Sequence, residues 1–208
     1  MVEQPIFDYR RHLDELYRSI HRRFEFRAKT LEEFKEWQRE FRKALKDALG
    51  LSNMEIDLDG YTPKAIKIDS VELDSYIREK WYIWVEPTTP LPFWLLKPKR
   101  IDRSLPLILT PHGHNHPDIY VGIARNEQER KAILEGERDI AVQAVMEGYI
   151  AIAPTARGFG ETMDKLECEE GAVSSCRSQL KHCLLVGRTP IGERVWDISR
   201  IIDWSLTQ

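Results

Sequence analysis

Two short apolar runs, far apart in the chain, constrain the fold more than any other feature of the sequence. Leu105–Thr110 and Tyr149–Pro154 are both continuous and apolar, which is typical of strands covered on both faces. The segment between them has helical periodicity that ends near Glu147, with Gly148 as its stop. Strand, helix and strand in this order predict parallel strands joined by a right-handed crossover. We therefore expect an open α/β sheet, with any site beyond the carboxyl ends of its strands.

The residues before this unit divide into a helical part and a group of strands. Two apolar stripes at helical spacing predict helices as far as Gly50, the second of them starting at a capping box of Thr30 and Glu33. Three later segments are rich in β-branched and aromatic residues and predict antiparallel strands: 66–68, 76–86 and 93–96. We expect a helical extension over residues 1–55 and an α/β domain over residues 56–208.

Composition narrows the classes of function. The 208 residues include 31 basic and 34 acidic ones, a net charge of −3, so bulk charge predicts binding to neither nucleic acid nor a membrane surface. The sequence has no apolar stretch long enough to span a bilayer and no secretory signal at its start, so we expect a cytoplasmic protein. Cys168, Cys176 and Cys183 are then expected as free thiols, and a Cys168–Cys176 disulfide is the alternative.

Three histidines follow the first buried strand, in the segment Pro111-His-Gly-His-Asn-His-Pro117. In one interpretation Gly113 lets the backbone turn tightly, and nearby N–H groups face a developing oxyanion. In a second, His112, His114 and His116 bind a metal ion, since imidazole is a common ligand of zinc. The HxHxDH pattern of metallo-β-lactamases is broken, because His116 and Pro117 stand at its last two ligand positions. In a third, the histidines are only hydrogen-bonded within a loop. We expect no bound metal and no cofactor.

A glycine-bearing loop follows the second buried strand. Arg157, Gly158 and Gly160 could cradle a phosphate, but the spacing is neither GxGxxG nor that of a P-loop, so a structural turn is favoured. The last helix is expected over Ile191–Leu206. Its charged residues Asp197, Arg200 and Asp203 predict a solvated or ion-paired face.

The sequence offers no convincing nucleophile. No serine lies in G-x-S-x-G or between a buried strand and a helix start, where a nucleophile elbow would sit. Cys183 lies in an apolar helical run and is expected to be a buried small hydrophobe.

Five segments, taken in order, carry a resemblance to a known family: Trp37–Leu45, Glu79–Pro98, Pro106–His114, Gly148–Glu161 and Gly192–Trp204. The order resembles an α/β-hydrolase, and more narrowly the acetyl xylan esterase and dienelactone-hydrolase-like branch. The resemblance implies a mixed, mostly parallel sheet and the hydrolysis of a small-molecule carboxylic ester. It also implies that Gly113 and His114 form part of the oxyanion hole. The residues implied for the loops of the site are His112, Arg157, Gly158 and Gly160.

The resemblance also implies what this chain leaves out. The family order is serine, then acid, then histidine, and the sequence stops at Gln208, before the strand that would carry the serine. We therefore expect the first half of the fold, without a catalytic triad and with little or no activity alone. The open sheet edge predicts self-association. The alternatives are the metal-dependent hydrolase of the histidine cluster, or a non-catalytic remnant that binds a partner through this edge.

Overall fold

The computed structural model describes residues 8–208, which form two compact units, one ending at Leu45 and the other spanning Lys46–Gln208. Residues 1–7, on which part of the argument about a secretory signal rests, lie outside the described residues. The expected domain division after residue 55 stays a prediction. None of the described helices is long and apolar enough to cross a membrane.

The N-terminal unit is helical, as its apolar stripes predict. Its helices are α1 (Tyr9–Ser19) and α2 (Leu31–Leu49), and α2 runs on into the second unit. The capping box is confirmed, because the Glu33 N–H donates to Thr30 Oγ1 and the Thr30 N–H donates to Glu33 Oε2, both at 3.2 Å. The apolar stripe of α2 packs within its own unit, where the Phe41 ring meets the Phe24 ring edge to face at 5.7 Å.

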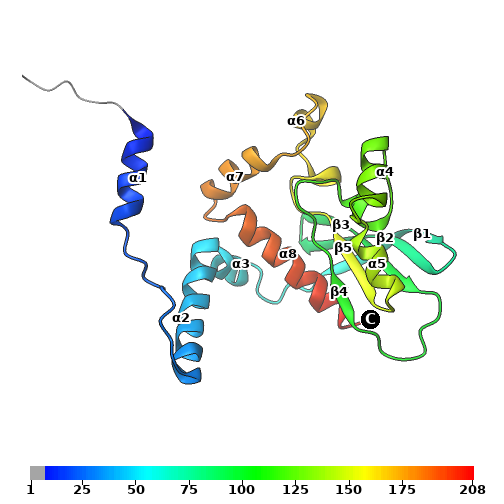
Figure 1. The fold of residues 1–208 in the computed structure, drawn as a ribbon, viewed down its shortest axis with the longest axis horizontal. Helices are drawn as coiled ribbons and strands as arrows, with labels where there is room; N and C mark the ends of the chain where they lie inside the picture. The colour runs from blue at the N-terminus through cyan, green and yellow to red at the C-terminus, as the bar shows by residue number, and fades with distance from the viewer. Residues whose placement is uncertain (1–7) are drawn as a thin grey trace, which may run out of the picture. The chain divides into compact units, whose positions relative to one another are not determined.

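A five-stranded sheet in the order β1-β2-β3-β5-β4 forms the centre of the second unit (Figure 1). The strands are β1 (Lys64–Glu72), β2 (Tyr76–Glu86), β3 (Thr89–Pro98), β4 (Leu107–Leu109) and β5 (Ile150–Pro154). The meander β1-β2-β3 is antiparallel, β5 joins β3 antiparallel, and β4 pairs with β5 in parallel. The sheet is mixed, as expected. The expectation of a mostly parallel sheet is wrong for these strands, because β4 and β5 form the one parallel pair and the other three pairs are antiparallel.

The crossover is divided into short helices rather than one long helix. The helices of this unit are α3 (Leu51–Asp57), η1 (Pro117–Val121), α4 (Glu127–Leu134), α5 (Ile140–Met146), η2 (Gly160–Thr162), α6 (Lys165–Glu169), α7 (Cys176–Leu185) and α8 (Pro190–Ser205). Gly122, at φ 75°, ends η1, and Asn126 starts α4 by accepting the Glu129 N–H. The predicted stop at Gly148 is confirmed by its φ of 87°.

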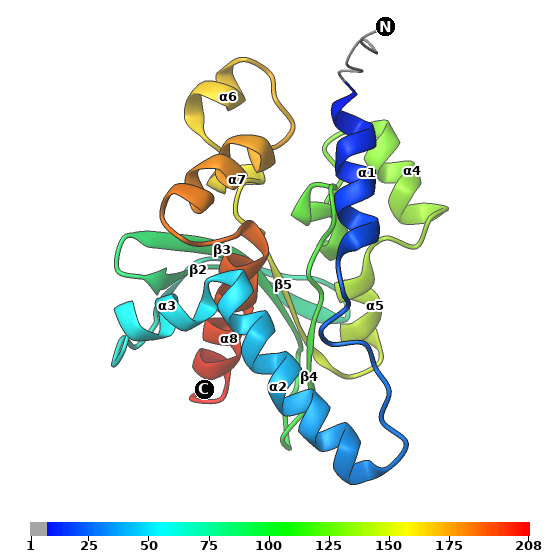
Figure 2. The same cartoon turned by 90° about the vertical axis from the view of Figure 1, so that its left-hand side faces the viewer.

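The core lies on both faces of the sheet. Ile152 belongs to the cluster that packs Trp196 and Ile201 of α8, whereas its neighbours Ala151 and Ala153 belong to the cluster on α5. This alternation follows from the two-residue period of a strand. Figures 1 and 2 accordingly show α8 and α5 on opposite faces. The second unit therefore has three layers, with the sheet between α5 and α8.

The start of α8 is fixed against the end of α2. Thr189 caps the helix by accepting the Gly192 N–H at 3.0 Å, and its hydroxyl donates to the Leu49 carbonyl at 3.0 Å. A Cβ on Gly192 would lie 2.1 Å from the same carbonyl oxygen. The two helices therefore approach at a position where only glycine fits.

The outer side of β4 carries no paired strand among residues 8–208. The Thr110 N–H donates to Ile152 O at 2.8 Å, and the Ile150 N–H donates to Pro106 O at 3.0 Å. Because backbone groups alternate in direction along a strand, those of Leu107 and Leu109 face away from β5. The sheet therefore has an open edge at this strand.

Candidate functional site

Two loops leave the sheet side by side at the carboxyl ends of β4 and β5, because these two strands are parallel neighbours. The first loop follows β4 and carries His112, Gly113 and His114. The second follows β5 and carries the segment Arg157–Gly160. Residues of both loops, among them His114 and Phe159, line a cavity of about 840 Å³. The structure thus brings together the two loops that the sequence analysis singled out.

His112 joins the two loops through both of its ring nitrogens. Its Nε2 accepts the Ala156 N–H at 2.9 Å, and its Nδ1 lies 2.8 Å from the Gly113 carbonyl oxygen. The ring also meets the Phe159 ring edge to face, with centroids 5.1 Å apart. Burial lowers the pKa of His112, and the nearby positive charge of Arg194 lowers it further. His112 is therefore held as a neutral ring between the loops.

Gly113 and His114 present backbone N–H groups that are free to bind a ligand. Neither group donates to any acceptor within the described part of the chain, and both residues are exposed. Gly113 does not have the left-handed φ that a tight glycine turn requires, and a Cβ there would meet nothing within 4 Å. The loop is therefore open above these amides, which a negatively charged oxygen atom could approach.

His116 serves the local structure of η1. Its Nδ1 accepts the Asp118 N–H at 3.3 Å, at the start of this short helix. Burial alone would raise the pKa of Asp118, but the neighbouring His116 and the hydrogen bond from Trp94 Nε1 lower it. The metal interpretation needs three converging ligands. Within residues 8–208 no group of three His, Cys, Asp or Glu side chains is placed to hold a metal ion, so the geometry does not support this alternative.

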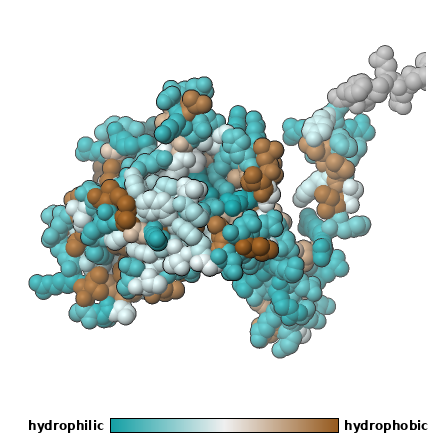
Figure 3. Space-filling view, turned by 180° about the vertical axis from the view of Figure 1, so that it is seen from behind, coloured by the Kyte–Doolittle hydropathy of each residue, from teal (hydrophilic) through white to brown (hydrophobic). Residues whose placement is uncertain are grey.

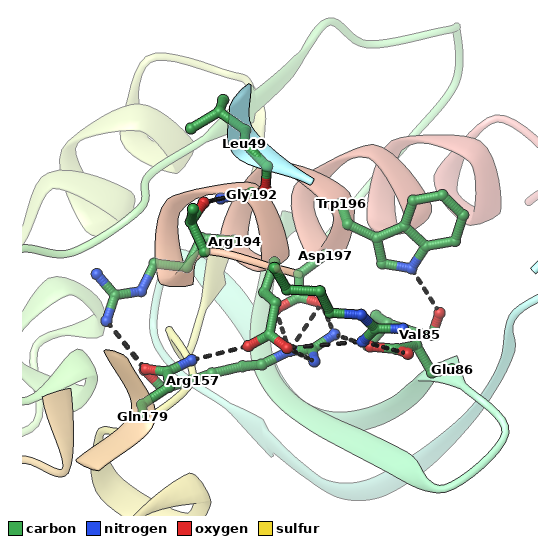
Figure 4. A network of polar contacts seen from close by, with 12 residues as sticks. Leu49, Val85, Glu86, Arg157, Gln179, Gly192, Arg194, Trp196 and Asp197 are labelled. Atoms are coloured by element: carbon green, nitrogen blue, oxygen red, sulfur yellow. Dashed lines mark hydrogen bonds and ion pairs between the residues drawn. The ribbon is translucent and has the colours of Figure 1, made fainter. Parts of the chain in front are cut away.

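Arg157 does not line a phosphate cradle, because its guanidinium turns into the protein (Figure 4). It forms a bidentate pair with Asp197 of α8, at 2.6 and 2.9 Å. It also contacts Glu86 at 2.6 Å and Glu193 at 3.3 Å. Arg188 pairs with Glu86 as well, at 2.9 Å. The geometry fits the favoured interpretation of this segment as a structural turn, because three buried carboxylates surround the Arg157 guanidinium.

This buried cluster carries more negative than positive charge. Its two arginines face three carboxylates, those of Glu86, Glu193 and Asp197. Burial raises the pKa of Asp197 to about 6, despite its pairing with Arg157. The same carboxylates raise the pKa of Arg157 above its ordinary value. The cluster therefore keeps Arg157 charged, whereas burial makes Asp197 take up a proton more readily than an ordinary aspartate.

Arg194 and Phe159 are part of this site that the sequence analysis did not identify. The Arg194 guanidinium lies over the Phe159 ring at 5.6 Å and donates from Nη2 to the Arg157 carbonyl at 3.1 Å. Asp197 was expected on a solvated or ion-paired face, and it is ion-paired but buried, whereas Arg200 and Asp203 form a pair nearer the surface. One available signal was the i, i+4 pair of acids Glu193 and Asp197, which requires a shared cation when it is buried.

A nucleophile is missing from the described site. None of the hydrogen bonds found within residues 8–208 joins a serine hydroxyl or a cysteine thiol to a histidine. Cys183 is buried, as expected, and burial raises the pKa of its thiol to about 11. The described residues therefore provide no activated nucleophile.

Comparison with known proteins bears on the fold and the family. A family model described as the Abhydrolase family matches residues 9–208. A proposed acetyl xylan esterase from Bacteroides fragilis is similar in structure, with a TM-score of 0.79 and 22% identity over 100% of this chain and 53% of that one. The methylesterase BT1017 has a TM-score of 0.46 and 17% identity, over 65% of this chain and 27% of its own. No curated protein sequence matches. The α/β-hydrolase fold is thereby confirmed, in a chain that spans about half the length of the Bacteroides fragilis protein.

Proposed function

The chain belongs to the Abhydrolase family, and from this membership we propose that it supplies the oxyanion-loop half of a carboxylic-ester hydrolase. The observation that carries the proposal is the pair of N–H groups of Gly113 and His114, which have no acceptor within residues 8–208. In α/β-hydrolases one oxyanion donor comes from the loop after this strand, and another from the residue after the nucleophile. Free amides at this position support that role for the loop.

The proposed reaction is attack of a serine on the acyl carbon of an ester. A histidine would take the serine proton, and an acid would orient the histidine. As the carbonyl oxygen becomes negative, the amides of Gly113 and His114 would donate to it. Serine, histidine and acid are assigned to no residue of this chain and would come from residues outside it. We therefore propose that this chain alone has little or no activity.

The substrate class and the setting are also proposals. The name of the similar Bacteroides fragilis protein supports a short acyl ester of the acetyl type as the small-molecule substrate. The reaction requires no cofactor, metal, nucleic acid or membrane. The three free cysteines support a reducing compartment and thus the cytoplasm.

The decisive experiment compares this chain with the longer product of its source reading frame, if the frame continues past codon 208. Both proteins are assayed with p-nitrophenyl acetate and treated with a fluorophosphonate, which labels activated serines. We expect hydrolysis and labelling for the longer protein and neither for this chain. Ester hydrolysis with serine labelling by this chain alone would contradict the assignment of the triad to other residues. An inactive longer protein would contradict the esterase function itself.

A matched pair of variants tests the oxyanion role in the longer protein. His114→Pro removes the backbone N–H, and His114→Ala removes only the side chain. We expect kcat of the proline variant to fall by a factor of about 10²–10³, which is the usual effect of removing one oxyanion donor. The alanine variant is expected to lose far less. Equal losses in both variants would mean that the imidazole, and not the amide, does the work.

The non-catalytic remnant is the second candidate function, and the open edge of β4 favours it. In this case the chain would bind another protein through Leu107 and Leu109, whose backbone groups face away from β5. A stable complex with a separate hydrolase half that restores ester hydrolysis would instead support a split enzyme. If the reading frame stops after codon 208, the experiment has to distinguish a non-catalytic remnant from one half of a split enzyme.

A further inference from the structure

One side chain spans the gap between the loop after β4 and the loop after β5. His112 belongs to the first loop, and its Nε2 accepts the N–H of Ala156 in the second at 2.9 Å. Its Nδ1 lies 2.8 Å from the carbonyl oxygen of Gly113, the neighbouring residue. The ring therefore connects the peptide unit that carries the His114 N–H to the loop that follows β5.

The second loop is itself fixed from the helical layer. Arg194 of α8 donates to the Arg157 carbonyl at 3.1 Å and lies over the Phe159 ring at 5.6 Å. Phe159 in turn meets the ring of His112 at 5.1 Å and that of His114 at 5.6 Å. Contacts therefore run without interruption from α8 through the second loop to His112.

The two hydrogen bonds of His112 require one protonation state. Nε2 accepts a backbone N–H, so it carries no proton, and Nδ1 carries the proton that it shares with the Gly113 carbonyl. A proton on Nε2 would point at the Ala156 N–H and break that bond. The charged and titratable groups near the ring are Arg194 of α8, His116 of the same loop, exposed His114 and the Tyr120 phenol. Arg194 and His116 act with burial to lower the pKa of His112.

We propose that His112 is a positioning residue, a neutral Nδ1–H imidazole that ties the two loops together and so holds the Gly113 and His114 amides ready for an oxyanion. His112 is not the general base, because the lone pair that a base would use already accepts the Ala156 N–H. The catalytic consequence of this inference rests on the proposed ester-hydrolase function. The tautomer and the link between the loops do not.

The first test uses nitrogen-15 NMR on this 208-residue chain. Long-range proton–nitrogen correlations at pH 7.5 identify which ring nitrogen of His112 carries the proton. We expect the Nδ1–H tautomer for His112, assigned by the loss of its signals in His112→Gln. An Nε2–H tautomer, or a doubly protonated ring at this pH, would overturn the inference.

The second test measures hydrogen exchange at the Ala156 amide. His112→Phe keeps a ring but removes the acceptor, so we expect Ala156 exchange to become about tenfold faster, as for the loss of one net hydrogen bond. His112→Gln places an amide oxygen near the position of Nε2 and is expected to restore most of the protection. The wild-type amide should lose protection as the pH falls through the pKa of His112. Unchanged Ala156 exchange in folded His112→Phe would contradict the proposed link.

The third test applies to the longer protein, should it prove to be an esterase. Displaced donors affect the transition state more than the bound ester, so His112→Phe is expected to lower kcat by about tenfold or more with little change in KM. His112→Gln should recover part of this loss. Unchanged kcat in His112→Phe would overturn the positioning role. An inactive wild type would overturn the esterase function and leave the tautomer and exchange results to decide the link.

Discussion

At the scale of single residues, Arg157 shows that the sequence of a loop does not predict the direction of a side chain. The sequence favours a structural turn for its segment, with a phosphate cradle as the alternative, and the guanidinium lies among the carboxylates of Glu86, Glu193 and Asp197. Glycine in the loop lets the backbone turn, with Gly158 at φ 83°. The turn thereby directs the arginine side chain inward, toward acids that come from β2 and α8.

Removal of the Arg157 charge should be strongly destabilising. Arg157→Met keeps much of the side-chain length but leaves three buried carboxylates with only Arg188 beside them. We expect the free energy of unfolding to fall by about 3–5 kcal/mol, measured by urea denaturation of this chain. Arg200→Met removes an arginine from a more exposed pair on α8 and should cost under about 1 kcal/mol. Similar losses in both variants would mean that the cluster around Arg157 adds no special stability.

Asp197 should give the stability of the chain a distinctive dependence on pH. Its pKa is about 6 in the folded chain, against an ordinary value of 3.8. Between these values the folded protein holds a proton that the unfolded chain has released. The contribution of Asp197 to the free energy of unfolding should therefore decrease as the pH rises from 4 to 6, by up to about 3 kcal/mol, and then level off.

Other carboxylates with lowered pKa values, such as those of Glu79 and Glu129, act in the opposite direction. The contribution of Asp197 is therefore isolated by comparing wild type with Asp197→Asn, by urea denaturation at intervals from pH 4 to 7.5. The difference between the two proteins should change across pH 4–6 and stay constant above pH 7. Asp203→Asn, in the more exposed pair on the same helix, is the matched control. A difference between wild type and Asp197→Asn that stays constant with pH would refute the raised pKa.

At the scale of elements, the start of α8 is a place where a Gly→Ala substitution should destabilise a helix rather than stabilise it. Gly→Ala inside a helix usually stabilises by about 1 kcal/mol. At Gly192 the added Cβ would lie 2.1 Å from the Leu49 carbonyl oxygen, which also accepts the Thr189 hydroxyl. We expect Gly192→Ala to destabilise by about 1–3 kcal/mol, measured by thermal or urea unfolding. Gly113→Ala is the control, because nothing lies within 4 Å of its Cβ and its stability should hardly change.

The elements themselves follow from local patterns, whereas the divisions of the crossover do not. The Thr30–Glu33 capping box, the β1-β2-β3 meander and the stop at Gly148 all depend on short-range chemistry, and all are confirmed. The helix expected before Glu147 is instead three short pieces. Its breaks depend on how η1 and α5 pack against the sheet, as with Val121 in the α5 cluster, and the apolar period alone does not contain this information.

The candidate site is likewise predictable only in part from the sequence. The loops after β4 and β5 were found because parallel strands bring their carboxyl ends to one edge. The role of His112 could not be predicted in this way. Its partner is the backbone N–H of Ala156, and a backbone group leaves no signature in the sequence. The three interpretations of the histidine segment could be separated only once the partners of each ring nitrogen were known.

At the scale of the whole molecule, the described sheet has two edge strands, β1 and β4, and we expect a partner at β4. Figure 3 shows several separate hydrophobic patches on a largely hydrophilic surface, so apolar area alone does not single out an interface. The edge of β4 differs, because the backbone groups of Leu107 and Leu109 face away from β5 and no described strand pairs there. A cavity of about 820 Å³, lined by Leu107 and Trp204 among others, lies beside it.

We therefore expect this chain to self-associate through β4, with an apparent mass by light scattering that rises with protein concentration. Leu109→Pro removes an outward N–H without breaking a hydrogen bond to β5, so it should shift the chain toward monomer. Leu109→Val shortens the same side chain but keeps the N–H, and should associate like the wild type. Far-UV circular dichroism checks that both variants keep their secondary structure. A wild-type chain that stays a monodisperse monomer and melts cooperatively would contradict this prediction, since it would mean that the open edge is protected without a partner.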